Sequence, residues 1–412
     1  MRILTVSTYV TNNRIPMLSQ CKSGFGYMVY DIAKSIAKTE QMDALLTNYR
    51  YDSFNADGIN FLKSRYHLFL KNLFSCCNIC LPLKLYYKFK PSLRLFVRIV
   101  YFWLLSGYYK KVIKEGGYDI VHIHGCGFYE EYLIEICKSL HQKFVITLHG
   151  LDSFSDSVVL EKAGKKFERY LLQRVVAGEF PITVISSGIK KIIENEYKVN
   201  NCKGINVVCN AFSFVEGNNK KTVNVRETYG LPGDAKILLC VGNICQRKNQ
   251  KQVIDAFHHL AAVIKQNVYV LFLGRDIEPE YHFAEYANSS SEKEHFVVCG
   301  NIDKEIIPSY YRQANGVILL SISEGFGLSL IEGMHFGLPC LTFEDLDAFD
   351  DIYSDSSVIG IKGRNVESVA KGLEALFTRK WNQEEIKLHS VKFEASTMAA
   401  LYIKSYKKII AQ

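Results

Sequence analysis

A glycine-spaced turn between a strand and a helix decides the fold of this chain. The turn and the helix read Ser323-Glu324-Gly325-Phe326-Gly327-Leu328-Ser329-Leu330-Ile331-Glu332-Gly333, and Gly337-Leu338-Pro339 follows. Residues 317–321 form an apolar run that predicts a buried strand, and the later glycine and proline end the helix. Glycines let a ligand approach the backbone closely, and the N–H groups of a helix start favour a phosphate or a developing anion. We therefore expect a strand–turn–helix unit that holds an anionic ligand.

Two carboxylates lie eight residues apart in this unit, Glu324 in the turn and Glu332 just over two helical turns along. Both can face the same crevice. Glu332 could then accept hydrogen bonds from a ribose diol, while Glu324 holds a polar group further along the ligand. The plain alternative is a loop glycine pair in which Glu324 is a solvated helix cap.

Strands alternate with helix-length segments on both sides of this unit, which favours parallel sheets. We expect two Rossmann-like, doubly wound α/β domains that face each other across a cleft. The first domain covers residues 1–215 and the second covers 223–390, with a Gly-, Asn- and Lys-rich linker near 216–222 and a C-terminal helix (391–412) packing back toward the first domain. The expected strands are 3–7, 118–124, 143–150 and 182–186, then 237–241, 268–274, 296–300, 316–321 and 340–343, and the expected helices of the second domain are 249–264, 303–313 and 328–336.

Further polar residues follow the predicted strands. Arg247 and Lys248 stand at the start of a helix after strand 237–241, where fixed positive charge can hold a diphosphate. A solvated basic turn is the alternative. In the first domain, Ser23-Gly24-Phe25-Gly26 opens a helix and is by itself an ordinary tight turn. His149 lies at a strand end, where ligands bind in such sheets.

These motifs, in this order, resemble the GT-B fold, retaining glycosyltransferases of family four (glycosyl transferases group 1). The resemblance rests on the glycine turn after strand one, Asp-Ile-Val-His-Ile-His, Thr-Leu-His-Gly-Leu-Asp, Val-Gly-x(5)-Lys-Asn, and Glu-x(7)-Glu-Gly with Gly-Leu-Pro. It covers most of the chain apart from roughly residues 50–115. Among these motifs, Glu-x(7)-Glu is quite specific, and the others are informative through their order.

The resemblance implies a metal-independent enzyme that moves a sugar from a nucleotide-diphosphate sugar to a glycan or lipid-linked acceptor. It implies that the second domain binds the donor and the first the acceptor, in surface polysaccharide or lipopolysaccharide assembly. The implied catalytic residues are His149 and Glu324. The implied donor-binding residues are Gly24, Gly26, Arg247, Lys248, Phe326, Gly327, Leu328 and Glu332.

The chain departs from the family pattern in two places. Asn243 stands where the family usually has an arginine, five residues before Lys248, so Arg247 has to supply charge from another direction. The usual Asn-Gly-Val-Asp after the sixth strand appears as Asn210-Ala211-Phe212-Ser213.

The basic charge of the chain is concentrated in one segment. The whole chain carries a net charge of +8, yet residues 58–114 hold 11 of its 50 Lys and Arg and none of its 42 Asp and Glu, so the remainder sums to −3. This insert also holds 13 aromatic residues. A helix from Pro91 would align one apolar stripe bordered by basic side chains, an arrangement typical of helices that lie on anionic membranes. The stripe is Leu93, Phe96, Val97, Val100, Tyr101 and Leu104, and the border is Lys84, Lys88, Arg94 and Arg98.

Two interpretations of this insert stay open, a membrane-facing or acceptor-facing surface and a stripe that packs on the sheet of its own domain. We expect a cytoplasmic protein, peripheral on the inner face of the cytoplasmic membrane, because the first strand takes the place of a signal peptide and twelve cysteines are scattered rather than paired. The insert is too apolar for a groove that tracks nucleic acid, so no nucleic-acid partner is expected.

Three rival functions remain less favoured. An oxidoreductase would need Gly-x-Gly-x-x-Gly followed by an acid about 20 residues on, and the chain lacks it. A catalytically inactive, membrane-associated GT-B scaffold is the second, and nucleic-acid binding is the third. Asp345-Leu346-Asp347 has the Asp-x-Asp pattern of metal-dependent glycosyltransferases, but it follows the nucleotide block of the second domain, so we expect an acidic loop and no bound metal.

Overall fold

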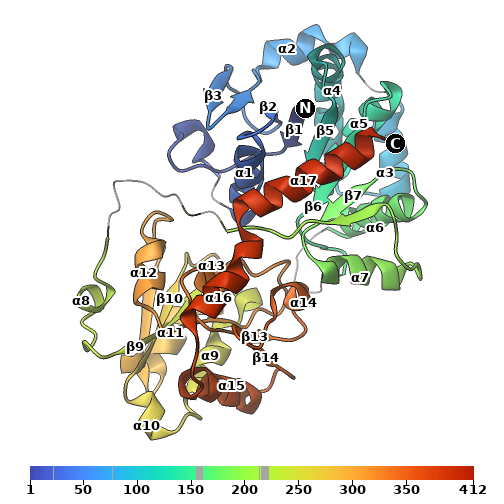
Figure 1. Ribbon diagram of the computed structural model, residues 1–412. Coiled ribbons are helices and arrows are strands. Elements are labelled where there is room, and N and C mark those ends of the chain that lie inside the picture. Colours follow the sequence, from blue (N-terminus) through green and yellow to red (C-terminus); the bar gives the residue numbers. More distant parts are fainter. Residues whose placement is uncertain (22, 77, 155–160, 213, 215–221) are drawn as a thin grey trace. The chain divides into compact units, whose positions relative to one another are not determined.

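The computed structural model describes residues 1–21, 23–76, 78–154, 161–212, 214 and 222–412. These residues form two compact units, Met1–Cys209 with Ala395–Gln412, and Asn210–Glu394. Each unit is an α/β domain built on a mainly parallel sheet (Figure 1). The predicted fold class of two parallel α/β domains is therefore confirmed.

The first unit contains an eight-stranded sheet in the order β3-β4-β2-β1-β5-β6-β7-β8. Its strands pair in parallel except for the β3–β4 edge hairpin. The central strands are buried on both faces, as expected for a parallel sheet between helices. The strands are β1 (Arg2–Ser7), β2 (Gln41–Leu46), β3 (Phe54–Ala56), β4 (Ile59–Phe61), β5 (Ile120–His124), β6 (Phe144–Leu148), β7 (Ile182–Val184) and β8 (Ile205–Val207). The helices are α1 (Gly24–Ile36), α2 (Tyr66–Lys71), α3 (Leu81–Phe89), α4 (Leu93–Gly116), α5 (Phe128–Ser139), α6 (Lys162–Val176), α7 (Ser187–Glu196) and α17 (Ala395–Ile410).

The last helix of the chain belongs to the first unit. α17 packs against α1 (Figure 1), and its Tyr402 and Tyr406 are fully buried. The sequence places this helix at 391–412, whereas the turn η6 (Val391–Phe393) before it belongs to the second unit. The N-terminal segment of the first unit ends at Cys209, six residues before the predicted boundary at residue 215. Residues 216–221 of the predicted linker lie outside the described residues.

The second unit contains a six-stranded parallel sheet in the order β11-β10-β9-β12-β13-β14. Its core is formed by the apolar faces of β9, β10 and β12 together with α9 and α15. The strands are β9 (Lys236–Val241), β10 (Val268–Leu273), β11 (Phe296–Gly300), β12 (Gly316–Leu319), β13 (Cys340–Phe343) and β14 (Val358–Ile361). The helices are α8 (Val225–Tyr229), α9 (Gln250–Phe257), α10 (Ala262–Lys265), α11 (Phe283–Ser289), α12 (Ile307–Gln313), α13 (Leu328–His335), α14 (Phe349–Ile352), α15 (Val366–Thr378) and α16 (Gln383–Ser390).

Two of the predicted helices differ from the observed ones. The helix predicted at 249–264 is divided into α9 and α10, because short-range hydrogen bonds tighten the chain after Phe257 and bring Leu260 into the core. The helix predicted at 303–313 begins only at Ile307, where Pro308 occupies a first-turn position that has no need of an N–H group.

Within the described residues, none of the helices is both long enough and apolar enough to cross a membrane.

Candidate functional site

The donor residues predicted in the second unit gather where two neighbouring strands end. β9 and β12 pair in parallel, so both strands lead into loops at the same edge of the sheet. β9 continues through Gly242 to the turn η3 (Gln246–Lys248), and β12 continues through residues 320–327 to α13. A hydrogen bond from the Ile322 N–H to the Arg247 carbonyl (2.8 Å) ties the two loops together.

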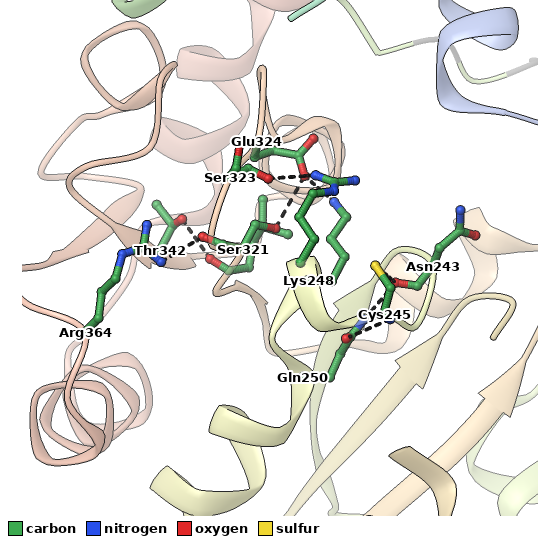
Figure 2. Close-up of polar contacts among 11 residues, drawn as sticks. Asn243, Cys245, Lys248, Gln250, Ser321, Ser323, Glu324, Thr342 and Arg364 are labelled. Atoms are coloured by element: carbon green, nitrogen blue, oxygen red, sulfur yellow. Dashed lines mark hydrogen bonds and ion pairs between the residues drawn. The ribbon is translucent and has the colours of Figure 1, made fainter. Parts of the chain in front are cut away.

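Glu324 and two cations form the centre of this group (Figure 2). The Lys248 ammonium donates to the Glu324 carboxylate, and Arg247 donates to the same oxygen at 3.3 Å and to the Ser323 carbonyl at 2.7 Å. The Ser321 hydroxyl donates to Glu324 at 3.4 Å. Burial by itself would raise the pKa of Glu324, but Lys248 and Arg247 hold that pKa below its usual value. The structure therefore brings together an ionised carboxylate and two positive charges, with a net charge of +1.

Two glycines in these loops have conformations or contacts that a larger residue would disturb. Gly242 has a φ of +149°, and a Cβ there would lie 3.3 Å from the Lys248 side chain. Gly327 caps α13 in the left-handed region, with a φ of +88°. The turn before α13 thus depends on glycine to place the helix start beside Glu324.

Phe326 and Leu328 flank Gly327 and differ in burial. The Phe326 ring is buried against Phe393, with the ring centroids 5.8 Å apart, so a contact with a ligand would have to use its backbone. Leu328 begins α13 and is half-buried. The first N–H groups of this helix have no partner within the helix, as at any helix start.

Glu332 is held by a residue that sequence reasoning did not identify. The Tyr311 hydroxyl, on the buried side of α12, donates to the Glu332 carboxylate at 2.8 Å. Burial and the nearby Glu332 raise the pKa of Tyr311, so this phenol is a donor at all ordinary pH values. Tyr311 is therefore a positioning residue for Glu332.

Arg364 is a second residue that sequence reasoning did not identify (Figure 2). Its guanidinium donates to both carboxylate oxygens of Asp345 (2.9 and 2.8 Å) and to the Ser321 and Ile322 carbonyls (3.0 and 3.2 Å). Asp345, the first acid of the Asp-x-Asp pattern, is thus engaged by an arginine that also supports the β12 loop. Burial, with the carboxylates of Glu324 and Asp345 nearby, raises the pKa of Asp347 to about 6.

Asn243 lies in the loop after β9 but takes no part in the Glu324 group. Its side chain is exposed, and its backbone carbonyl accepts a hydrogen bond from Gln250 at 2.9 Å. The positive charge at this turn accordingly comes from Arg247 and Lys248.

The first unit carries its own group of predicted residues, formed by the glycine turn and His149. Ser23 caps α1 through a hydrogen bond from the Gly26 N–H (3.0 Å), and a Cβ on Gly26 would clash with Thr11 at 2.2 Å. Gly24 faces open space. The Phe25 ring contacts the His149 imidazole edge-on, with centroids 5.0 Å apart. The structure therefore brings the turn and His149 together.

His149 is the half-buried outer member of a histidine pair whose inner member, His124, is fully buried. His124 Nδ1 lies 3.1 Å from His149 Nε2, and His124 Nε2 lies 3.1 Å from the Thr5 hydroxyl. Burial lowers the pKa of His149 to about 4, so the ring is neutral at pH 7. The contact with His124 orients the His149 ring and leaves its Nδ1 outside this bond.

A third histidine, His122, connects this region with the end of the chain. His122 bonds to Thr147 through Nε2 (2.7 Å) and to the Tyr406 hydroxyl of α17 through Nδ1 (2.6 Å). Residues two apart on a strand share a face, so His122 with His124, and Thr147 with His149, form a polar layer over two adjacent strands. That alternation is visible in the sequence and could have predicted the layer.

Comparisons with known proteins agree with this geometry. The model of the glycosyl transferases group 1 matches residues 222–389, and that of glycosyltransferase family 4 matches residues 82–213. An O-antigen biosynthesis glycosyltransferase of Escherichia coli, WclY, is 22% identical over 70% of this chain and 80% of its own. Two solved structures each cover 99% of this chain. A glycosyltransferase from Rickettsia africae ESF-5 has a TM-score of 0.71 at 16% identity over 98% of its own chain, and Anabaena HepE, in complex with UDP and glucose, has a TM-score of 0.67 at 12% identity over 100% of its own.

The two α/β units and these matches define the class of the protein as a glycosyltransferase. More narrowly, the chain belongs to glycosyltransferase family 4 and has the GT-B fold, as the sequence predicted.

Proposed function

We propose that this enzyme transfers a sugar from a nucleotide-diphosphate sugar to a glycan or lipid-linked acceptor, with retention of configuration, in surface polysaccharide or lipopolysaccharide assembly at the inner face of the cytoplasmic membrane. The observation that carries the proposal is the convergence of Lys248 and Arg247 on Glu324 beside the start of α13. Two fixed cations and a helix start suit a diphosphate. The O-antigen assignment of the Escherichia coli relative supports the biological setting.

The proposed reaction uses the diphosphate as leaving group. The bond between the anomeric carbon and the phosphate oxygen breaks, and the acceptor oxygen bonds to that carbon from the same face. The acceptor's proton passes to the departing diphosphate. Lys248, Arg247 and the N–H groups of α13 would stabilise the negative charge that develops on the diphosphate. In this scheme Glu324 and the backbone of residues 326–328 hold the donor sugar and phosphates.

The other predicted residues receive roles from the same proposal. Glu332, oriented by Tyr311, would accept hydrogen bonds from the ribose hydroxyls. His149 would contact the donor sugar as a neutral imidazole, and the turn with Gly24 and Gly26 would approach the phosphates. We propose that no metal takes part, and the engagement of both Asp345 oxygens by Arg364 supports this.

A panel of nucleotide sugars tests the function. A true donor should raise the melting temperature, because a ligand that binds only the folded state stabilises it by mass action. The same donor, with an acceptor extract, should be consumed with release of a nucleoside diphosphate at an equal rate with and without a chelator. Loss of turnover in chelator with rescue by manganese would point instead to Asp345 and Asp347. Donor binding without any turnover would favour the inactive scaffold.

Replacing Glu332 with alanine should weaken nucleoside diphosphate binding by about 10- to 100-fold, because hydrogen bonds to a charged group contribute about 1.5–3 kcal/mol. Tyr311→Phe should have a smaller effect in the same direction, since it leaves the carboxylate but removes its orienting donor. Titration calorimetry with the nucleoside diphosphate measures both. Glu374→Ala, an exposed change on α15, is the control. Unchanged affinity in the Glu332 variant would remove this residue from the site.

A further inference from the structure

An exposed surface that is both apolar and basic covers part of the first unit. Nine of the eighteen large apolar side chains that are exposed in the described part of the chain lie within residues 66–97. Soluble surfaces seldom gather apolar side chains in this way unless they bind a partner. The nine residues are Tyr66, Leu70, Phe74, Ile79, Leu83, Tyr86, Tyr87, Leu93 and Val97.

The face of α4 that packs into the core is not the predicted apolar stripe. Its buried side chains include Ile99, Phe102, Leu105, Tyr109 and Ile113, and the Tyr132 hydroxyl of α5 donates to the Ile99 carbonyl at 3.0 Å. The core thus uses a second apolar face of the same helix. The outer face of α4 also carries apolar side chains at its start, beside Arg94 and Arg98, and this mixed face is left for another partner.

The predicted stripe is instead exposed at its start and half-covered further on. Leu93 and Val97 are 78% and 59% exposed. Phe96 packs against Tyr86 of α3 (ring centroids 4.8 Å apart), and Tyr101 is covered by Arg50. The interpretation that this stripe packs on the sheet of its own domain is therefore wrong for Leu93 and Val97.

α3 continues the same surface beside the first turns of α4. Leu85 and Phe89 point into the core, while Leu83 (52%) and Tyr87 (74%) are exposed on the opposite side of the helix. The contact between Tyr86 and Phe96 joins this side of α3 to the exposed start of α4. We call this the α3–α4 surface, formed by Leu83, Tyr86, Tyr87, Leu93 and Val97 with Lys84, Lys90, Arg94 and Arg98.

The charges around the α3–α4 surface are of one sign almost throughout. The exposed cations Lys84, Arg94 and Arg98 lie on the same two helices, and the exposed Lys90 directly follows α3, all within a segment that has no acidic residue. Among the described residues, the Glu161 carboxylate reaches the start of α4, where it accepts hydrogen bonds from the N–H (2.5 Å) and hydroxyl (2.9 Å) of Ser92. That carboxylate caps a helix start, and the exposed Lys162 follows it directly.

We infer that the α3–α4 surface docks onto a lipid bilayer with anionic headgroups. Aliphatic and aromatic side chains can enter the headgroup layer, while long basic side chains reach the lipid phosphates. Exposed aliphatic side chains such as Leu83, Leu93 and Val97 give nucleic acid nothing to stack on or pair with. The inference deepens the proposed function. The docking itself is argued from the surface, and only its purpose, bringing the enzyme to a lipid-linked acceptor, rests on the proposed function.

Vesicle sedimentation tests the inference without any sugar donor. The wild-type chain should sediment with vesicles of phosphatidylcholine and phosphatidylglycerol, and less with phosphatidylcholine alone. One variant changes Lys84, Arg94 and Arg98 to Glu, and leaves Lys88 because its ammonium lies 3.3 Å from the centre of the Tyr170 ring. At about 1 kcal/mol for each basic residue near the surface, the loss of three of them should weaken binding by at least about 100-fold, and the added carboxylates should weaken it further. A second variant, Leu83, Tyr87, Leu93 and Val97 to Ser, should lose at least as much.

Matched controls carry the same number and kind of substitutions at exposed positions of the second unit. The charge control changes the exposed Lys362, Lys371 and Lys380 to Glu, and the apolar control changes Val263, Ile277, Leu388 and Val391 to Ser. Both should sediment like the wild type. All replaced residues are exposed, so unchanged melting temperatures will confirm folding.

Three outcomes would overturn the inference. The first is a wild-type chain that sediments with neither kind of vesicle. The second is a loss of binding in the controls as large as in the surface variants. The third is a wild-type chain that binds no vesicles but forms a dimer, which the apolar variant converts to a monomer. In the third case the surface would be an interface between two copies. Stabilisation of the same proteins by the donor, measured without vesicles, reports separately on the proposed function, so either can fail alone.

Discussion

Replacing Lys248 with alanine should lower kcat/KM for the nucleotide sugar by about 10²- to 10³-fold, the loss typical of removing one preorganised group that stabilises transition-state charge. The Lys248 side chain is 14% exposed and lies across the Gly242 turn, with its ammonium on the Glu324 carboxylate. Without it, one arginine would have to balance both Glu324 and the departing diphosphate. Most of the loss should appear in kcat, because charge on the leaving group grows as its bond breaks.

The variants Lys248→Arg and Glu324→Gln help to separate charge from folding. Lys248→Arg keeps the charge and should retain more activity than the alanine variant. In the double variant, Lys248→Ala with Glu324→Gln, the effects should not add, because the two side chains contact each other. Lys251→Ala is the matched control, since Lys251 lies on the adjacent helix α9 but places its ammonium over the rings of Tyr281 and Tyr286.

Initial rates over a range of donor concentrations, together with melting temperatures, are the measurements. A Lys248→Ala enzyme that stays folded and works within twofold of the wild type would exclude Lys248 from the diphosphate site. An equal loss in the Lys251 control would show that the effect comes from disturbing α9.

Most of the central strands of both sheets were predictable because they are mainly apolar runs, interrupted in β5 and β6 only by uncharged histidine and threonine. β2 was not predicted, and its buried Asp43 explains why: a carboxylate interrupts the apolar pattern. The structure satisfies this acid with hydrogen bonds from Tyr118 (2.8 Å), Asn60 (2.9 Å) and Arg2 (3.2 Å). A strand can contain a buried polar residue when other parts of the chain supply its hydrogen-bond partners. The apolar periodicity of one segment does not show that such partners exist.

Prediction of the candidate site is likewise limited to residues that a local sequence pattern reveals. Arg247, Lys248 and Glu324 were predictable because each follows a strand within a few residues, and parallel strands end at one edge of a sheet. Tyr311 and Arg364 lie 21 residues before Glu332 and 19 residues after Asp345 respectively, and they reach their partners only through the fold. Positioning residues of this kind have no motif of their own.

Replacing His149 with alanine should lower kcat by about 10²-fold, while nucleoside diphosphate affinity changes only a few-fold. The proposal places the diphosphate on Lys248 and Arg247, whereas His149 would contact only the donor sugar, so the variant should separate turnover from binding. His124→Ala should give a smaller loss in the same direction, because it removes the partner that orients the His149 ring. The control is His141→Ala, an exposed histidine of the same unit.

The pH dependence distinguishes a functional His149 from a merely structural one. With a pKa of about 4, its imidazole is neutral from pH 5 upward, so His149 itself should contribute no titration to turnover near the ordinary histidine value of 6.5. Unfolding exposes the ring and restores that value, so the unfolded state binds more protons between pH 6.5 and 4. The stabilisation linked to this group is complete above pH 6.5 and declines by about 1.4 kcal/mol per pH unit toward pH 4.

Denaturant unfolding at several pH values therefore accompanies the rate measurements. The wild-type enzyme should lose stability more steeply than the His149→Ala variant as pH falls from 6.5 to 4. If the alanine variant keeps wild-type turnover but changes this slope, His149 stabilises the layer above β5 and β6 and does not act on the donor sugar. If turnover falls while nucleoside diphosphate affinity and stability at pH 7.5 stay near wild type, the loss arises in the transfer step, where a neutral hydrogen-bonding imidazole is needed.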